Sequence, residues 1–275
     1  MNFVARRIPQ FPDFLSHPRE RPVSDPACTS VPTAKKTGHR TDLLTGIRLV
    51  VFDAVGTVIT PRPSVKAIYT AIGRKFGSQL DEATVDRRFR EVFRSTERNG
   101  ARELPDPVDA VAWRTSEVEE LARWRGIVDY VLDDVADREA CFDELFRHFA
   151  DASVWHVYPD VRPALDGLAQ LGIELALASN FDARLHPVCD GLPDLQRLTR
   201  RFISSQVGVR KPARQFFAHI LEQTGRSASE VLMVGDDAVN DVAGARESGL
   251  RAVRVDRKSV PAEGEIARLT ELLGW

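Results

Sequence analysis

Short apolar runs recur along the chain, and longer stretches with helical periodicity lie between them. The first run, residues 47–52, is mostly apolar and rich in β-branched side chains, which predicts a strand buried on both faces. Comparable runs cover residues 173–178, 231–234 and 252–255, and a weaker one covers 201–203. Helical stretches separate most of these runs, so we expect a parallel sheet with helices on both faces, the α/β class.

The long interval between the first two predicted strands has the periodicity of helices. Ser64 is expected to precede one helix and Asp81 to open a second, because each stands before a stretch of regularly spaced apolar residues. A fourth helix is expected around Leu145. The predicted inward face of the third helix consists of Val111, Val118, Leu121 and Trp124.

These patterns predict the domain organisation. We expect residues 46–60 and 157–275 to form the α/β core, and residues 61–156 to form a helical cap inserted into it. Such a cap can cover the carboxyl ends of the strands, where open α/β sheets bind ligands. Residues 1–45 hold six prolines and no apolar periodicity, so a disordered extension is expected there.

Composition narrows the classes of protein. The chain has 38 basic and 40 acidic residues, a balance that argues against nucleic-acid binding by bulk electrostatics. No stretch reaches the roughly 18 consecutive apolar residues that span a bilayer, so a membrane protein is not expected. The three cysteines lack C-x-x-C spacing, which argues against a disulfide framework or a structural zinc site. We therefore expect a soluble cytoplasmic protein.

Polar residues that carry chemistry follow the first two predicted strands. Asp53 comes directly after the first strand, where a carboxylate can act as a nucleophile, ligate a metal or cap a helix. Ser179 and Asn180 follow the second strand and offer neutral donors to an anion, although an ordinary helix cap has the same sequence.

Two later segments add charge. Lys211 precedes Pro212, which we expect at the first position of a helix, so that the lysine is presented at the end of the sheet. Asp236, Asp237 and Asp241 follow the strand at residues 231–234. Three carboxylates at one strand end repel each other unless a cation lies among them, and oxygen ligands suit a hard ion such as Mg²⁺. A solvated helix start is the alternative for this segment.

The order of these segments, Asp53, Ser179, Lys211-Pro212 and Gly235-Asp236-Asp237-(x)₃-Asp241, resembles the four motifs of the haloacid dehalogenase (HAD) superfamily of hydrolases. The insertion after the first motif matches the helical cap of its subfamily I, and the resemblance covers residues 47–260. It implies a Rossmann-like α/β core and, with the acidic fourth motif, a Mg²⁺-dependent phosphatase that acts on a small phosphorylated compound.

The resemblance also implies roles for individual residues. Asp53 attacks phosphorus and becomes an aspartyl-phosphate, and Lys211 balances the charge. Thr57, Ser179 and Asn180 bind the substrate. The implied ligands of Mg²⁺ are Asp53, the backbone carbonyl of Val55, Asp236, and either Asp237 or Asp241.

One position departs from the pattern of the phosphatases. They carry a second Asp two residues after the nucleophile as general acid and base, and this chain has Val55 there. Because general acid–base catalysis contributes about 10²–10⁴-fold, a loss of rate is expected with alkyl phosphates. Three interpretations stay open: a phosphatase limited to good leaving groups, a non-catalytic protein that binds phosphate and metal, and a 2-haloacid dehalogenase. The last is considered because Asp-Ala-Val-Gly-Thr in this chain resembles the first motif of the 2-haloacid dehalogenases. The acidic fourth motif argues against the dehalogenase.

Overall fold

The computed structural model describes residues 43–97 and 111–274. Residues 1–42 of the expected extension lie outside the described residues. Leu43 and Leu44, which the sequence analysis assigned to that extension, form a turn and pack against the core. Residues 98–110 of the expected cap also lie outside the described residues.

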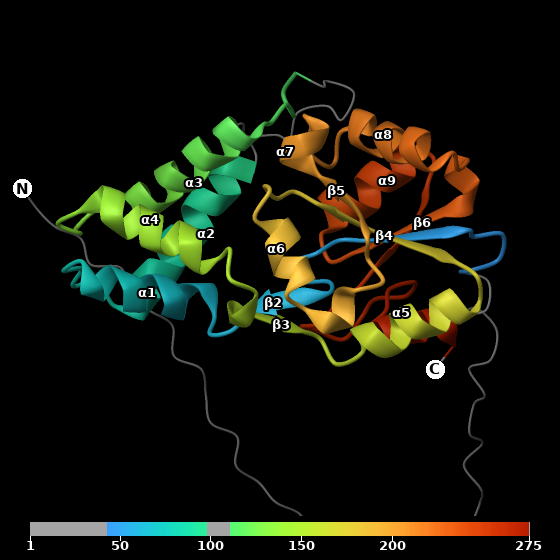
Figure 1. Cartoon of the computed structure of the whole chain (residues 1–275), viewed down its shortest axis with the longest axis horizontal. Coiled ribbons are helices and arrows are strands. Elements are labelled where there is room, and N and C mark those ends of the chain that lie inside the picture. The colour runs from blue at the N-terminus through green and yellow to red at the C-terminus, as the bar shows by residue number, and fades with distance from the viewer. Residues whose placement is uncertain (1–42, 98–110, 275) are drawn as a thin grey trace, which may run out of the picture. The chain divides into compact units, whose positions relative to one another are not determined.

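A parallel sheet forms the centre of the core, as the sequence predicts (Figure 1). Its order is β5-β4-β1-β6-β7, and every neighbouring pair of strands is parallel. The weak run at residues 201–203 is therefore a real strand, at one edge of the sheet. The strands are β1 (Leu49–Phe52), β4 (Glu174–Ser179), β5 (Arg200–Ile203), β6 (Val231–Gly235) and β7 (Arg251–Arg254).

Both faces of the sheet are covered, which explains the continuous apolar runs of its strands. Val50 and Phe52 of β1 face a cluster that includes α5 and α6. Leu49 and Val51 face the opposite cluster, which includes α8 and α9. The helices of the core are α5 (Val161–Gln170), α6 (Leu185–Asp190), α7 (Ser204–Val207), α8 (Arg214–Thr224) and α9 (Gly244–Glu247), the last preceded by a π-helical turn (Ala238–Ala243).

A helical cap lies between two short strands, β2 (Ile59–Pro61) and β3 (Trp155–Val157), which pair in antiparallel fashion. Ser64 directly precedes the first cap helix, and Asp81 accepts a hydrogen bond from the backbone N–H of Thr84 at the start of the second. An apolar cluster distinct from those of the sheet joins the cap helices to each other. They are α1 (Val65–Lys75), α2 (Glu82–Glu97), α3 (Glu117–Val131) and α4 (Arg138–His148) (Figure 1).

Two local predictions are wrong. Val111 precedes α3 and is 69% exposed, and Val118 is 76% exposed. The buried face of α3 instead carries Glu120, Ile127, Val128 and Val131. Pro212 does not begin a helix either: the Lys211–Pro212 peptide bond is cis, and α8 begins two residues later, at Arg214.

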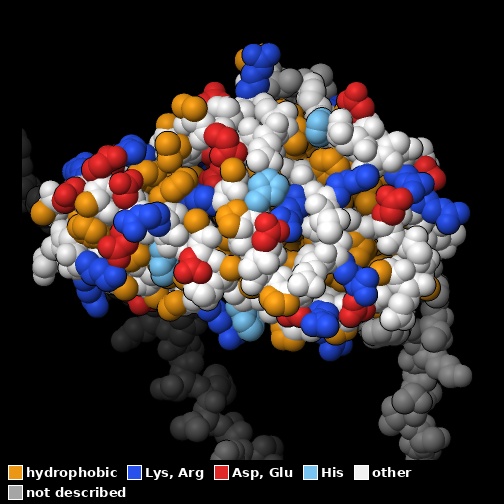
Figure 2. All heavy atoms as spheres, in the orientation of Figure 1, with side chains coloured by type: hydrophobic (Ala, Val, Ile, Leu, Met, Phe, Trp, Pro, Cys, Tyr) orange, Lys and Arg blue, Asp and Glu red, His pale blue; other side chains and the backbone are white. Residues whose placement is uncertain are grey.

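Acidic and basic side chains are interspersed over the face shown in Figure 2. This distribution agrees with the near-equal counts of acidic and basic residues in the sequence. Within residues 43–97 and 111–274, no helix has both the length and the apolar character needed to cross a membrane. Cys141 and Cys189 are buried and form no disulfide.

Candidate functional site

The parallel strands bring the first, second and fourth motifs to one edge of the sheet. Strand β1 lies between β4 and β6, and Phe52 is level with Leu177 on one side and Val234 on the other. The residues that follow these positions therefore leave the sheet together. This register places Asp53 beside the ends of β4 and β6, where Ser179 and Asp236 lie.

Lys211 links the first and fourth motifs through direct ion pairs. Its Nζ donates to Asp53 Oδ1 at 2.8 Å, to Asp241 Oδ1 at 2.6 Å and to the backbone carbonyl of Ala178 at 2.8 Å. The lysine is 1% exposed and Asp241 is 1% exposed. A buried ammonium group requires such partners, and here each of its three N–H bonds has an acceptor.

The side chain of Asn180 positions this lysine. Asn180 Nδ2 donates to the carbonyl of Lys211 at 2.9 Å, and Asn180 Oδ1 accepts from the Lys211 backbone N–H at 2.8 Å. The side chain that the sequence suggested as a donor to the substrate is thus bonded to the loop of the third motif. Ser179, which is buried, lines the cavity beside it.

Two glycines allow the backbone to approach the acidic side chains closely. Gly56 has a φ of +94°, and a Cβ atom there would overlap the carboxylate of Asp236. A Cβ atom at Gly235 would overlap the carboxylate of Asp241. The hydroxyl of Thr57 is fully buried and donates to Asp236 Oδ1 at 3.4 Å. Thr57 is outside the set of residues that line the cavity, among those that the structure describes.

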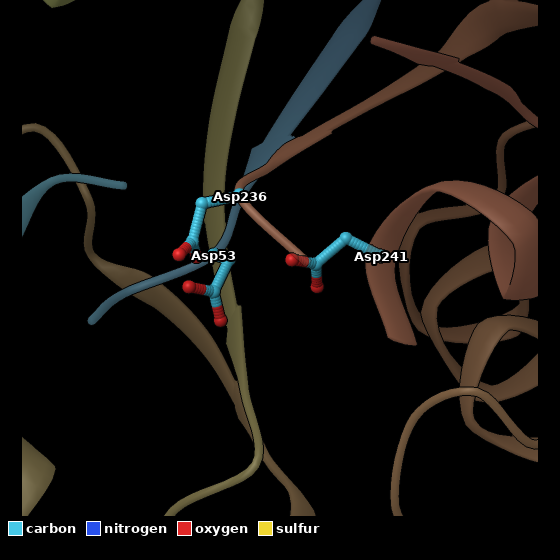
Figure 3. A group of neighbouring side chains, drawn as sticks. All are labelled: Asp53, Asp236 and Asp241. Atoms are coloured by element: carbon cyan, nitrogen blue, oxygen red, sulfur yellow. The ribbon is translucent and has the colours of Figure 1, made fainter. Parts of the chain in front are cut away.

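Asp53, Asp236 and Asp241 each offer an oxygen atom, and these atoms lie within 4.8 Å of one another. Figure 3 shows the three carboxylates turned toward one another at the strand ends. Asp237 has a different environment: it is exposed, and its carboxylate accepts from the backbone N–H groups of Val239 and Asn240 at the start of the π-helical turn. Of the two alternatives for the fourth motif, Asp241 is the one that joins the cluster.

Burial shifts the pKa values of the charged groups in this cluster. Burial raises the pKa of Asp53 above its ordinary value, although the charge of Lys211 opposes the shift. Burial together with the charge of Asp241 raises the pKa of Asp236 to about 6. Burial also raises the pKa of Asp241 to about 7, against the effect of Lys211. For Lys211, burial lowers the pKa, but the charges of Asp241 and Asp53 and their hydrogen bonds raise it above its ordinary value.

The donor set fits a hard divalent cation. Asp53 and Asp241 pair with the ammonium group of Lys211, and Asp236 lies beside them, so three carboxylates share one ammonium group and two negative charges stay uncompensated within this group when all are ionised. The ligand atoms are all oxygen, as Mg²⁺ requires. Burial is the main cause of the raised pKa values of Asp236 and Asp241, and a neighbouring carboxylate adds to each shift.

A cavity of about 600 Å³ lies between this cluster and the cap. Its base includes Asp53, Ser179, Lys211, Asp236 and Asp241, and its other side is lined mainly by aromatic side chains. Val55 also lines it and is 37% exposed, so its side chain lies at the surface of the cavity rather than in the core.

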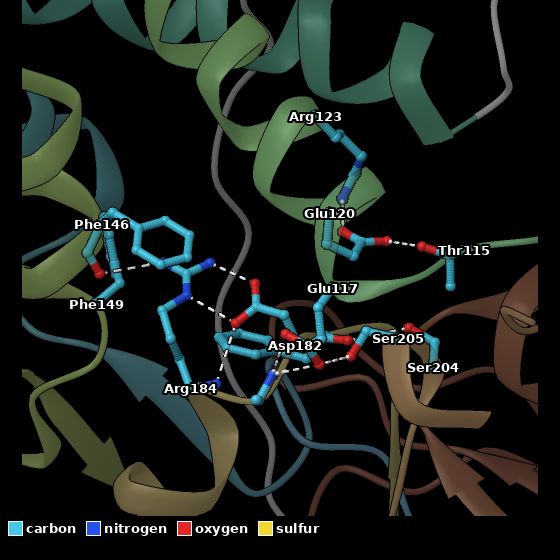
Figure 4. Close-up of polar contacts among 12 residues, drawn as sticks. Thr115, Glu117, Glu120, Arg123, Phe146, Phe149, Asp182, Arg184, Ser204 and Ser205 are labelled. Atoms are coloured by element: carbon cyan, nitrogen blue, oxygen red, sulfur yellow. Dashed lines mark hydrogen bonds and ion pairs between the residues drawn. The ribbon is translucent and has the colours of Figure 1, made fainter. Parts of the chain in front are cut away.

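Polar contacts join the cap to the core (Figure 4), and one of the residues that make them, Arg184, also lines the cavity. Glu117, in the first turn of α3, accepts from the Ser205 hydroxyl at 2.5 Å and from the backbone N–H of Ala183 at 3.1 Å. Arg184 pairs with Asp182 at 2.7 Å and reaches the backbone carbonyl of Phe146 in the cap. These contacts hold α3 and α4 against the loop that follows Ser179.

Glu120 adds a buried link between the cap and the third motif. It is 1% exposed, accepts from the Thr115 hydroxyl at 2.8 Å, and lies 3.2 Å from Arg123 and 3.7 Å from Arg210. Sequence reasoning missed this residue. The signal is a spacing of four and seven residues from Glu120 to Trp124 and Ile127, which puts an acid on the apolar face of the helix.

Comparison with known proteins identifies relatives among the haloacid dehalogenase-like hydrolases. Residues 47–249 match the haloacid dehalogenase-like hydrolase family. The chain is 29% identical over 239 residues to haloacid dehalogenase-like hydrolase domain-containing protein 3 of Danio rerio, covering 82% of this chain and 95% of that protein. It is 30% identical over 240 residues to a phosphoserine phosphatase of Thermus thermophilus, covering 80% and 92%.

Solved structures of a phosphatase and of a dehalogenase both share this fold. A HAD phosphatase from Thermococcus onnurineus superposes with a TM-score of 0.57 at 24% identity, covering 83% of this chain and 97% of that one. An L-2-haloacid dehalogenase from Xanthobacter autotrophicus superposes with a TM-score of 0.60 at 21% identity, covering 83% and 87%. Because both activities occur on this fold, the choice between them rests on the residues of the site.

Proposed function

Because this chain belongs to the haloacid dehalogenase-like hydrolase family, we propose that it is a Mg²⁺-dependent phosphohydrolase acting on a small phosphorylated compound. The observation that carries the proposal is the buried cluster at the base of the cavity. In it, Asp53 is paired with Lys211 and stands beside two further carboxylates, Asp236 and Asp241. The phosphoserine phosphatase among its relatives supports the same reaction class.

Each residue has a part in the proposed reaction. Asp53 attacks phosphorus and forms an aspartyl-phosphate, which water then hydrolyses. Lys211 keeps Asp53 ionised and oriented through the 2.8 Å ion pair. Ser179 lines the cavity beside the nucleophile and donates its hydroxyl to a phosphoryl oxygen. The substrate roles expected for Thr57 and for the backbone at Asn180 stay predictions.

Asp53, Asp236 and Asp241 would hold the Mg²⁺ ion, together with the backbone carbonyl of Val55. When bound, the ion supplies positive charge for the phosphoryl group and for the carboxylates that surround it. Asp237 is left out of this set because its carboxylate caps the π-helical turn.

The two alternatives differ from this proposal at identifiable residues. A 2-haloacid dehalogenase would have to bind a substrate carboxylate next to Asp53, where Asp236 and Asp241 add negative charge. A non-catalytic protein that binds phosphate and metal is favoured by Val55, which cannot transfer a proton. It would keep the cluster and lose turnover. The expected cytoplasmic location stays a prediction.

Release of nitrophenol from para-nitrophenyl phosphate, measured with Mg²⁺ and again with EDTA, tests the proposal. The leaving phenolate is stabilised, so the assay examines Asp53 and the metal without requiring an acid at position 55. We expect turnover with Mg²⁺ that EDTA abolishes and that Asp53→Asn eliminates. Absence of turnover with retained Mg²⁺ binding would favour the non-catalytic protein, and chloride release from 2-chloropropionate without metal would favour the dehalogenase.

A further inference from the structure

A continuous row of aromatic side chains lines the cavity opposite the acidic cluster. Each ring contacts the next, with centroids 5.2–6.2 Å apart. Faces and edges of aromatic rings bind other planar rings by offset stacking and edge-to-face contact. The members of this row, which we call the aromatic belt, are Trp124, Phe93, Phe89, Tyr69, Phe149, Trp155 and Phe181.

Two arginines lie over rings of the belt, and both are paired with carboxylates of the protein. The guanidinium group of Arg123 lies 5.2 Å from the ring centre of Phe93, and that of Arg184 lies 5.5 Å from the ring centre of Phe181. Arg184 is bonded to Asp182, and its guanidinium group lies 3.6 Å from the ring centre of Phe146. Arg123 pairs with Glu120. Arg94, in the last turn of α2, is exposed, so its charge is hydrated without a substrate.

A substrate with a polar organic part would lose its own hydration against the rings of this wall. The two arginines that lie over the rings already have carboxylate partners, Asp182 and Glu120. Phosphoserine, the substrate named for the Thermus thermophilus relative, has an ammonium and a carboxylate group and fits the belt poorly. A planar apolar group fits it well. The cavity volume of about 600 Å³ leaves room for such a group beyond the phosphoryl moiety.

The residue at position 55 gives a second, independent reason to expect a substrate with an aromatic leaving group. Val55 faces the cavity where a proton donor to the leaving group would be needed. An alkoxide cannot depart without that proton at a useful rate, whereas a phenolate delocalises its charge into the ring. Without a proton donor at position 55, the reaction needs a leaving group such as a phenolate. The aromatic belt binds planar rings, so both features favour the same leaving group.

We propose that this site hydrolyses aryl phosphates, the phosphate monoesters of phenols, and that the aromatic belt holds the ring of the leaving group. The proposal rests on the phosphohydrolase activity proposed above. A bond forms between an Asp53 oxygen and phosphorus while the phosphorus–phenol oxygen bond breaks, and its electron pair leaves on the phenolate. Water then replaces Asp53 on phosphorus, and its two protons end on the phenol and on inorganic phosphate.

Two pairs of substrates distinguish the effect of the leaving group on kcat/KM from the effect of the ring. Phenyl phosphate and cyclohexyl phosphate are similar in size but differ in leaving group, and we expect kcat/KM to be at least about 10²-fold higher for the phenyl ester. 2-Naphthyl phosphate and acetyl phosphate both have leaving groups that depart without an acid, but only the first has rings. A higher kcat/KM for the naphthyl ester is expected. Equal values within either pair would overturn the proposal.

A matched pair of variants locates the effect in the belt. Phe93→Leu removes one belt ring, and Phe142→Leu removes a buried cap ring that lies outside the residues lining the cavity. We expect the ratio of naphthyl to acetyl activity to fall about three- to tenfold in Phe93→Leu, the effect of one ring contact, and to stay unchanged in Phe142→Leu. The same change in both variants would show that the ratio reports the stability of the cap, and would overturn the proposal.

A binding measurement keeps this proposal distinguishable from the proposed reaction. Asp53→Asn protein is titrated calorimetrically with 2-naphthyl phosphate and with inorganic phosphate in the presence of Mg²⁺. Tighter binding of the naphthyl ester supports recognition of the ring even if the wild-type protein shows no turnover, in which case the proposed reaction alone fails. Equal affinities would remove the role of the belt whatever the rate of turnover.

Discussion

Val55→Asp is the substitution that tests most directly why this site should need good leaving groups. Val55 lies two residues after Asp53, lines the cavity and is 37% exposed. Valine and aspartate have similar volumes, so a carboxyl group at this position enters the cavity without disturbing the core. The change supplies the proton donor that the leaving alkoxide lacks.

The size of the gain follows from the chemistry and the surroundings. General acid–base catalysis contributes about 10²–10⁴-fold, equivalent to about 2.7–5.5 kcal/mol of barrier, and this is the increase in kcat/KM expected with an alkyl phosphate. An aryl phosphate should gain less than about tenfold, because its leaving group needs little protonation. Burial and the charge of Asp241 raise the pKa of Asp236 to about 6. The negative charge of the cluster acts in the same direction on the pKa of a new carboxyl group at position 55, which helps it stay protonated as an acid.

The assay compares wild type, Val55→Asp and Val55→Asn on cyclohexyl phosphate and para-nitrophenyl phosphate, with Mg²⁺ present. Asparagine has the shape and polarity of aspartate but does not transfer a proton, so it is the matched control. A gain confined to Val55→Asp and to the alkyl ester would confirm the reasoning. Equal gains in both variants would show that polarity rather than proton transfer is responsible, and no gain in either would refute the missing acid as the limitation.

Three further predictions concern the cluster and the cap. Asp53→Asn should lower kcat by at least about 10³-fold without changing the circular dichroism spectrum, and an active variant would exclude a covalent intermediate at this residue. Because the pKa values of Asp236 and Asp241 are raised to about 6 and about 7, the stability of the metal-free protein should fall as pH rises through this range. Mg²⁺ binds the deprotonated carboxylates, so its stabilisation in thermal melts should increase from about pH 5 to about pH 8, and a constant increment would contradict the site. Glu120→Ala removes a buried carboxylate that lies 3.2 Å from Arg123 and 3.7 Å from Arg210, and it should lower the free energy of unfolding by about 3–5 kcal/mol. The control is Glu119→Ala, at an exposed position of the same helix, and equal effects of the two would refute the prediction.

The part of the site that belongs to the sheet was predictable from the sequence. Carboxyl ends of parallel strands meet at one edge, so residues that follow apolar runs are brought together by the fold itself. The ion pair between Lys211 and Asp53 spans 158 positions in sequence. Asp53 was identified by its place after a strand, and Lys211 by its place before Pro212. The strand at residues 201–203 was also predicted, although its apolar run is short. It lies at an edge of the sheet, where a short apolar run is sufficient.

Features that depend on long-range packing were not predictable in the same way. The Asn180 side chain looks like any polar group after a strand, and only the structure shows it bonded to the backbone of Lys211. Pro212 was placed at a helix start because proline favours that position, but α8 begins at Arg214. In α3 the exposed Val118 was taken for the buried face, because apolar spacing alone does not show which face meets the rest of the cap. The aromatic belt draws on three helices, one strand and two loops, whose proximity no local pattern encodes.

The lysine explains why position 55 should govern the choice of substrate. All three N–H bonds of Lys211 are occupied by Asp53, Asp241 and the carbonyl of Ala178, so its charge acts on the phosphoryl group without delivering a proton to it. Fixed charges at the base of the cavity can stabilise the nucleophile and the transferring group. They do nothing for the oxygen that departs. With Val55 in place of a proton donor, that oxygen must leave as a stable anion, and the cap then selects among the compounds that meet this requirement.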